Sequence, residues 1–400
     1  MFPAAYRELL QIRRARLPLV ASIVGRLPIA LSGLAAIFLV QAETGSFASA
    51  GIVEACYTVG AAIGLPAQGR LVDRIGQTRV LVPASLLSAA ALAGFVIAAR
   101  DGASLAILGA LNVVAGLTVP PLSQCMRGLW GSLLDDEHSL QTAYALDAVV
   151  IEVAFITGPL LAAVVAASIS PSAAVILGLV LSLSGGLVFA ASEASRAWRA
   201  AGGPTHWAGP LRAAGIWVLL GASFGFGVAN GALALALTAF GSHHGATEIV
   251  GPFISIQAVA SMLGGIWYGA RRWNSPPEDR YPRLNMLLAL GFVPLVFATS
   301  LPAMGVVMLL AGLAIAPAAA VEYVLIDRLA PRGTSTEAFG WVITATVLGS
   351  GIGSGLSGAI VNTGHVRLGF VLALAGAVLA WMASAVGRGA LRASPEPSRA

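Results

Sequence analysis

The stretch Gly69-Arg70-Leu71-Val72-Asp73-Arg74-Ile75-Gly76-Gln77-Thr78-Arg79 is a charged segment between two long apolar runs, residues 47–68 and 80–99. It holds three arginines and one aspartate, whereas the two runs together hold a single charged residue, Glu54. Its two glycines permit a tight turn, because glycine adopts backbone conformations that other residues avoid. The segment therefore predicts a short polar connection between two apolar helices.

The composition of the whole chain excludes most classes of soluble protein. Of its 400 residues, 57% are hydrophobic and only 10% are charged, whereas a soluble domain carries about 25% charged residues. All 23 basic residues are arginines scattered along the chain, which does not predict a nucleic-acid surface. Cys56 and Cys125 lie inside apolar runs, where a thiol behaves as a small hydrophobic group. They indicate neither a disulfide nor a metal site.

Twelve apolar runs are long enough to cross a bilayer. A hydrocarbon core of roughly 30 Å requires about 20 helical residues. The predicted fold class is therefore an all-α membrane protein with twelve transmembrane helices. The first run is too long for a signal sequence, and we expect it to be retained. The predicted spans are Leu17–Val40, Phe47–Gln68, Val80–Ala99, Leu105–Met126, Ala143–Ala166, Ser172–Ser192, Ala213–Phe240, Ile249–Ala270, Leu284–Ser300, Met304–Ile326, Phe339–Val361 and Leu368–Val386.

The distribution of arginines predicts the orientation in the membrane. With the N-terminus inside, twenty arginines fall on the cytoplasmic side and only Arg100 and Arg367 face out. Cytoplasmic segments carry the excess of basic residues in membrane proteins. Both termini are therefore expected in the cytoplasm. The arginine-only, Ala- and Gly-rich composition is typical of a GC-rich bacterium, so the predicted location is a bacterial cytoplasmic (inner) membrane.

The chain divides into two similar halves. Residues 193–212 are polar, contain Gly202-Gly203-Pro204 and read as a linker between six-helix bundles at 1–192 and 213–400. Short matches at one offset of 196 residues predict that the bundles are pseudo-symmetric. They pair Ala115-Gly116-Leu117 with Ala311-Gly312-Leu313, Pro121 with Pro317, and Gly69 with Gly265.

The charged segment resembles the signature of the loop between helices two and three in the major facilitator superfamily, roughly Gly-x-Leu-Ala-Asp-Arg-x-Gly-Arg-Lys. Six positions are kept if Arg79 is counted as displaced by one. The resemblance implies a transporter of the major facilitator fold, whose loop holds the two halves together when the cytoplasmic side is closed. The alternative is a simple positively charged turn. The counterpart at 265–272 lacks the aspartate, so we expect this contact on one side only. The gating residues so implied are Gly69, Asp73, Arg74 and Gly76.

A second resemblance lies in the fifth span. Residues 154–163 are similar to the Gly-x-x-x-Gly-Pro-x-x-Gly-Gly pattern of superfamily antiporters, with only Gly158-Pro159 literal. The resemblance favours export over import, and the proline can bend the helix at an outward gate. A generic packing face is the alternative. Superfamily drug exporters often carry an arginine where this chain has Asn112. The basic residue nearest to it is Arg127, a further gating candidate expected to contact Asp73 or lipid headgroups.

Ionisable residues inside the hydrocarbon are the leading functional candidates, because each costs about 2.5–3.5 kcal/mol to insert. Arg26 and Glu152 both lie roughly 14 Å from the cytoplasmic face at the helical rise per residue. Both could face the central cavity and form a pair there, and we predict that Glu152 carries the coupling proton. Alternatively, Arg26 reaches the interface and Glu152 stays protonated against a carbonyl. Glu54, about 10 Å below the outer face, is either a proton station or an interface residue.

The remaining polar residues have weaker assignments. We expect Asp147 to be solvated or near a helix start, and Glu322 to take part in a cytoplasmic gate or an ion pair. The adjacent His243 and His244 lack a third ligand, so no metal site is predicted. Three uncharged side chains are substrate-cavity candidates that could equally bond a neighbouring helix: Asn112, Asn230 and Gln257.

Together these patterns predict a secondary transporter, first of all a proton-coupled exporter of a small amphipathic molecule. Its expected partners are the substrate, protons and the bilayer; we expect a monomer without a cofactor. An importer or facilitator of a polar solute, such as a sugar or organic acid, is the second hypothesis. A non-transporting membrane protein is the third. The sequence holds no P-loop, Gly-x-Ser-x-Gly or His-Glu-x-x-His motif, so it is not expected to be an enzyme.

Overall fold

The computed structural model describes residues 4–200, 208–246 and 250–392, and in this part of the chain the regular structure is entirely helical. The first half contains α1 (Ala4–Gln11), α2 (Arg13–Arg26), α3 (Pro28–Thr44), α4 (Phe47–Ile75), α5 (Gln77–Arg100), α6 (Leu105–Leu117), α7 (Leu122–Leu133), α8 (Glu137–Ser168), α9 (Pro171–Ala191) and α10 (Glu193–Ala197). The second half contains η1 (Gly209–Arg212), α11 (Ala214–His243), α12 (Val250–Gly269), α13 (Pro277–Phe292), η3 (Val293–Phe297), α14 (Leu301–Gly312), α15 (Ile315–Leu329), α16 (Ser335–Asn362), α17 (Val366–Val386) and α18 (Arg388–Leu391).

Three of the twelve membrane segments are interrupted helices. The first consists of α2 and α3, the fourth of α6 and α7, and the tenth of α14 and α15. Proline explains the breaks, because it lacks an N–H and its ring collides with the carbonyl four residues earlier. Pro28 follows the first break, Pro121 precedes α7, and Pro317 lies near the start of α15. Since Pro121 and Pro317 are related by the 196-residue offset, the two halves break at equivalent places.

The ninth segment begins earlier than the sequence predicts. Its helix α13 starts at Pro277, and Glu278 and Asp279 in its first turn favour a helix start. It ends at Phe292, where η3 with Pro294 continues the chain. With 16 residues α13 is too short to count among the eleven candidate spans that meet a length and hydropathy criterion in the described part of the chain. It completes the twelve segments of the fold.

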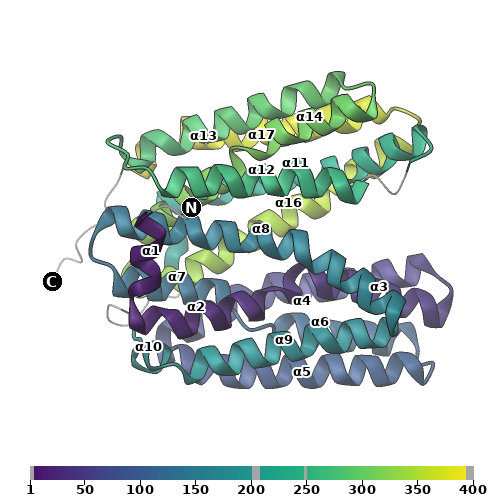
Figure 1. The fold of residues 1–400 in the computed structure, drawn as a ribbon, viewed down its shortest axis with the longest axis horizontal. Helices are drawn as coiled ribbons and strands as arrows, with labels where there is room; N and C mark the ends of the chain where they lie inside the picture. Colours follow the sequence, from purple (N-terminus) through teal and green to yellow (C-terminus); the bar gives the residue numbers. More distant parts are fainter. Residues whose placement is uncertain (1–3, 201–207, 247–249, 393–400) are drawn as a thin grey trace.

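The helices form two groups. Figure 1 shows α2–α9 in the lower group and α11–α17 in the upper group, with α1 and α10 at the left. We call this end, where α2 and α11 begin and α9 and α17 end, the terminal end. Of the predicted linker, α10 and η1 are described, whereas Gly202-Gly203-Pro204 lies outside the described residues. The linker boundaries therefore stay a prediction.

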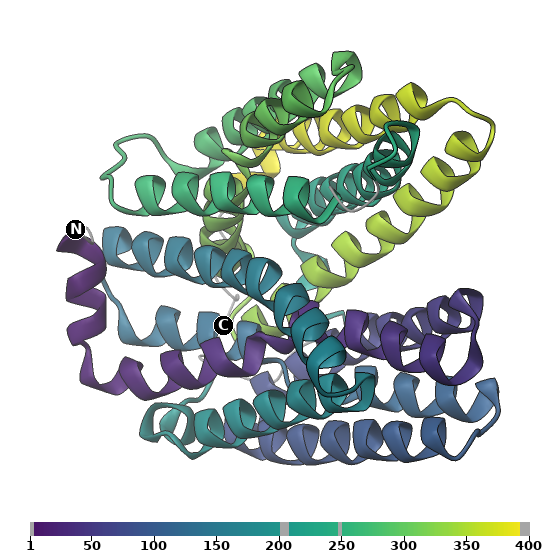
Figure 2. The ribbon, with the colours of Figure 1, turned by 45° about the vertical axis from the view of Figure 1, so that its right-hand side comes forward.

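The two halves pack against each other mainly at the terminal end. One core cluster there contains Leu129 and Trp130 of the first half together with Ile326 and Phe339 of the second. Towards the other end, each half has a core of its own in the described part of the chain. Figure 2 shows the ribbons of the two groups diverging in that direction. The molecule is therefore closed at the terminal end, and its halves separate towards the opposite end.

Candidate functional site

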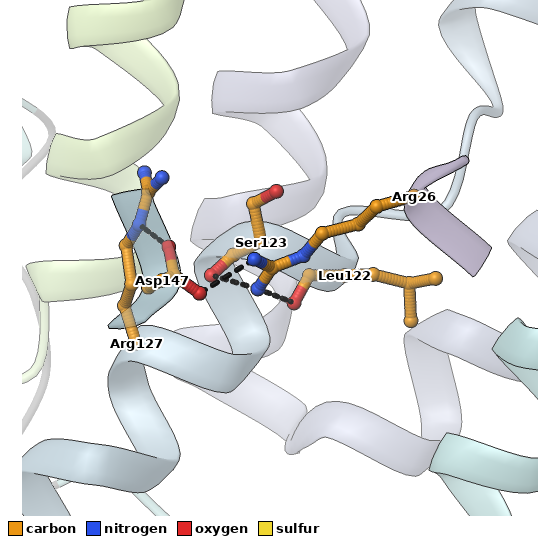
Figure 3. Close-up of polar contacts among 5 residues, drawn as sticks. All are labelled: Arg26, Leu122, Ser123, Arg127 and Asp147. Atoms are coloured by element: carbon orange, nitrogen blue, oxygen red, sulfur yellow. Dashed lines mark hydrogen bonds and ion pairs between the residues drawn. The ribbon is translucent and has the colours of Figure 1, made fainter. Parts of the chain in front are cut away.

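Two arginines share one aspartate inside the first half (Figure 3). Asp147 on α8 accepts hydrogen bonds from Nη1 of Arg26 at 2.5 Å and from Nε of Arg127 at 2.7 Å. Arg26 is the last residue of α2, and its Nη2 also donates to the carbonyls of Leu122 and Ser123 at the start of α7. All three charged side chains are at most 4% exposed. The cluster therefore keeps one net positive charge in the interior.

This cluster corrects three predictions. Arg26 does not pair with Glu152, because Glu152 lies five residues after Asp147 and so about 140° further round the helix. Asp147 is not solvated but 2% exposed. Arg127 contacts neither Asp73 nor the membrane surface, because Asp147 binds it inside the bundle. Arg26 and Glu152 were predicted to lie at the same depth in the membrane. The face of α8 on which each acid lies decides which of them binds Arg26.

Arg127 also joins the two halves. Its guanidinium carbon lies 3.6 Å from the centre of the Tyr323 ring and 5.3 Å from that of Phe339, both in the second half. Tyr144 of α8 packs edge-on against the same two rings. A guanidinium over an aromatic face is attracted by the ring quadrupole, more strongly where water is excluded. Through Arg127 these rings connect the charged cluster of the first half to the second half.

Glu152 takes part in a different contact between the halves. Ser261 of α12 donates its hydroxyl to Oε1 of Glu152 at 2.7 Å and accepts the N–H of Ala316 at 3.0 Å. Ala316 lies in the first turn of α15, whose N–H groups have no partner within the helix. Glu152 is partly buried and forms no ion pair in the described part of the chain. One serine thus connects a carboxyl group in the first half to a helix start in the second.

The contact between α8 and α12 continues from Ser261 to the terminal end. Thr142 donates its hydroxyl to the carbonyl of Gly269 at 2.8 Å. Tyr6 of α1, only 1% exposed, donates to the carbonyls of Gly265 and Ile266, each at 3.2 Å. Gly269 has no side chain to displace Tyr6. Sequence reasoning missed Tyr6, whose aromatic ring in a short polar helix near the N-terminus was the available signal.

The opposite contact joins α4 to α16. The carboxylate of Asp73 accepts the N–H groups of Thr336 at 3.3 Å and Glu337 at 2.9 Å, in the first turn of α16. Negative charge is favourable there because these N–H groups are unpaired and the helix dipole is positive. Gly69 allows the close approach, since a Cβ on it would lie 2.7 Å from the carbonyl oxygen of Thr336. The charged segment does contact the second half.

Two details of this contact differ from the prediction. Arg74 is exposed and forms no ion pair in the residues the structure describes, whereas Arg70 forms one with Glu337 at 3.2 Å. Only every third or fourth residue of α4 faces α16, and Asp73 and Arg70 share that face. Contact between the halves is also not one-sided, because Tyr6 and Thr142 hold the α8–α12 side.

Glu322 lies in a small cavity inside the second half rather than in an ion pair. Its Oε1 accepts hydrogen bonds from the hydroxyls of Ser223 and Tyr281. The cavity measures about 50 Å³ and is also lined by Asn285. In the described part of the chain no cation lies within ion-pair distance of Glu322, which corrects that alternative.

The other predicted residues are dispersed. The Glu54 carboxylate lies against Gly33 of α3. Gly158, with Pro159 next to it, packs α8 closely on Leu31 of α3.

The substrate-cavity candidates also lie apart. The amides of Asn112 and Asn230 each donate to a carbonyl four residues earlier in their own helix. Gln257 is 7% exposed, and its Nε2 has no partner in the described part of the chain. Of the two glycines expected to permit a tight turn, Gly76 lies in one, with a φ of 92°, whereas Gly69 lies inside α4. The roles of all these residues stay predictions.

Comparisons with known proteins agree with this architecture. A family model described as Major Facilitator Superfamily matches residues 19–278. No curated protein sequence matches the chain. The human organic anion transporter MFSD10 (TETRAN) is similar in structure, with a TM-score of 0.77, 14% identity, and coverage of 93% of this chain and 99% of that chain.

Two further solved structures are similar over nearly their whole length. For a bacterial homologue of the iron transporter ferroportin in an outward-facing state, the TM-score is 0.76 at 14% identity, covering 94% of this chain and 99% of that one. For the E. coli fucose:proton symporter FucP, the TM-score is 0.71 at 12% identity, with coverage of 94% and 99%. At such identities these structures establish a common fold alone.

Proposed function

Because this chain belongs to the Major Facilitator Superfamily and is a multi-pass membrane transporter rather than an enzyme, we propose that it exports a small amphipathic molecule in exchange for protons. It acts as a monomer in a bacterial cytoplasmic membrane, with both termini in the cytoplasm. The arginine bias of twenty against two supports this orientation. The terminal end is then cytoplasmic, and the closed contacts there correspond to an outward-open conformation.

The observation that carries the proposal is the Glu152–Ser261 hydrogen bond between the halves. Among the hydrogen bonds between α8 and α12 in the described residues, it lies further from the terminal end than that of Thr142 and closer to where the halves begin to separate. A hydrogen bond to an ionised carboxylate is roughly twice as strong as one to a neutral group. Protonation of Glu152 from the open side therefore weakens the contact that keeps the cytoplasmic side closed. This links proton binding to the change between outward-open and inward-open conformations.

The charged cluster leaves Glu152 available for this role. Asp147 already binds both Arg26 and Arg127, so no guanidinium holds Glu152 permanently ionised. A carboxylate with a single hydroxyl donor in a low-dielectric interior is costly to keep charged. Glu152 is therefore suited to bind and release a proton once per cycle. For the substrate we assign first contact to Gln257, because its buried Nε2 lacks a partner.

The test uses purified protein in liposomes, after a thermal-shift screen has identified a transported compound. Proton-gradient-driven export and gradient-independent exchange are measured for the wild type, Glu152→Gln and Glu137→Gln. Glu137 is the matched control, because it lies on the same helix but its side chain is 60% exposed. We expect Glu152→Gln to retain exchange and to lose dependence on the gradient. Gradient-driven export that persists in Glu152→Gln refutes the carrier role. If the wild type moves the substrate in the same direction as the protons, it is an importer instead.

A further inference from the structure

A second cavity lies at the terminal end, on the outside of the first half. Its volume is about 170 Å³, and it is formed where the turn between α4 and α5 meets the chain around α10. Its lining does not include Asp73, Arg70 or Glu152, which form the contacts between the halves described above. Its lining residues are Ile75, Gly76, Thr78, Arg79, Arg196 and Arg199.

The charge of this cavity is uncompensated. Three of its six lining residues are arginines and none is acidic. Arg79, Arg196 and Arg199 form no ion pair in the described part of the chain, where the neighbouring Glu193 pairs with Arg14 instead. Three arginines thus line a space large enough for a phosphate group.

The local backbone holds one of these arginines in place. Nη1 of Arg199 donates to the carbonyls of Arg196 at 3.0 Å and Trp198 at 2.6 Å. It lies 3.3 Å from the point where a Cβ on Gly76 would be. Gly76 has a positive φ of 92°, a conformation that favours glycine. The guanidinium is therefore pre-positioned beside the turn, and its Nε and Nη2 donate to no acceptor in the described part of the chain.

The start of α5 adds further donors. Its N-cap residue is Gly76, so in the described part of the chain no capping side chain accepts a hydrogen bond from its first turn. Gln77 donates to the carbonyl of Cys125 and Thr78 to that of Ala190, so both side chains point into the protein. The unpaired N–H groups of a helix start favour an anion. They supplement the three arginines, which carry the argument.

We propose that this cavity binds the phosphate of an anionic phospholipid in the cytoplasmic leaflet. With the termini in the cytoplasm, the cavity lies at the inner surface of the membrane, where basic pockets between helices bind anionic headgroups. Its wall includes the apolar Ile75, and exposed apolar residues continue along α5 and α9, among them Leu86, Leu87 and Val188. A lipid satisfies both features, because its phosphate binds the arginines while its acyl chains cover the apolar faces.

The test measures lipid binding by native mass spectrometry on the delipidated full-length protein. Phosphatidylglycerol is compared with phosphatidylcholine, and inorganic phosphate is added as a competitor. In one variant Arg79, Arg196 and Arg199 are all replaced by Gln. In the matched control Arg13, Arg272 and Arg332 are replaced by Gln, because they are exposed arginines of the same predicted side outside the cavity.

We expect the cavity variant to lose affinity for phosphatidylglycerol on the order of a hundredfold, since each surface arginine contributes about a factor of five. The control should stay within about threefold. Arg79→Gln alone removes no hydrogen bond that the structure shows in the described part of the chain, so it should fold normally and lose about fivefold. Equal losses in the two triple variants, or equal binding of phosphatidylcholine, would overturn the site. Displacement of the lipid by inorganic phosphate would assign the cavity to a soluble anion instead.

Discussion

The guanidinium carbon of Arg127 lies 3.6 Å from the centre of the Tyr323 ring, and the two residues occupy equivalent positions of the two halves, 196 residues apart. A contact between equivalent positions lies close to the pseudo-twofold axis that relates the halves. Arg127 is bound to Asp147 within its own half, whereas Tyr323 belongs to the other. When the terminal end opens, we therefore expect the ring contact to break and the ion pair to persist.

The shared aspartate should dominate the stability of the first half. Asp147→Asn leaves two buried guanidinium groups without a carboxylate, and breaking a buried pair costs about 3–5 kcal/mol. Arg26→Gln should cost less, because Asp147 still pairs with Arg127. Thermal unfolding in detergent, followed by tryptophan fluorescence, measures both changes.

The exposed pair between Glu137 and Arg328 serves as the control for this prediction. Its side chains are 60% and 42% exposed, and such pairs contribute about 0–1 kcal/mol. If Asp147→Asn unfolds at the same temperature as Glu137→Gln, the buried cluster does not stabilise the fold as described.

Asp73→Asn should impair transport more than folding. The amide keeps the shape of the side chain and one accepting oxygen but removes the charge that faces the start of α16, and such a charge at a helix start contributes about 0.3–1 kcal/mol. The cytoplasmic closure should weaken by that amount, so the transport rate per folded molecule falls. Arg74→Gln is the control, because Arg74 is exposed beside Asp73. Normal transport by Asp73→Asn would reduce the segment to a simple turn.

Gly69→Ala should also weaken the closed state. The added Cβ would lie 2.7 Å from the carbonyl oxygen of Thr336, which forces α4 and α16 apart. Gly51→Ala is matched to it, because Gly51 lies on the same helix and nothing lies within 4 Å of its added Cβ. Distances between spin labels at the terminal ends of α4 and α16 should lengthen in the first variant only. Identical distance distributions would contradict the close-approach argument.

Tyr6→Phe should loosen the end of α12. The ring remains, but the hydrogen bonds to the carbonyls of Gly265 and Ile266 are lost, at a cost of about 0.5–1.5 kcal/mol. Amide hydrogen exchange in residues 265–271 should accelerate, with little change in protein yield. Tyr57→Phe removes a phenol hydroxyl elsewhere and should leave this segment unchanged. Unaltered exchange in Tyr6→Phe would show that α1 does not hold the halves together.

The sequence predicted features that depend on local composition and spacing. Apolar length indicated the twelve segments, and the glycines and charges of residues 69–79 indicated a contact near Asp73. It did not predict which acid binds Arg26, because the rise per residue gives the depth of a side chain and packing decides the direction in which it points. It missed the contacts of Tyr6, because the acceptors are backbone carbonyls, which every residue has and which therefore leave no pattern in the sequence. Applied to Arg127, the 196-residue offset leads to Tyr323, so the contact between these equivalent positions could have been considered from the sequence.

Asp73 binds the second half through the backbone N–H groups of Thr336 and Glu337. Any residue other than proline supplies such a group, so this contact tolerates sequence divergence at the start of α16. Halves taken from different homologues could then be recombined into working chimeras, provided that a helix begins at the same place. Compensating substitutions between position 73 and α16 would be a poor guide to this contact, because the groups that bind Asp73 belong to the backbone.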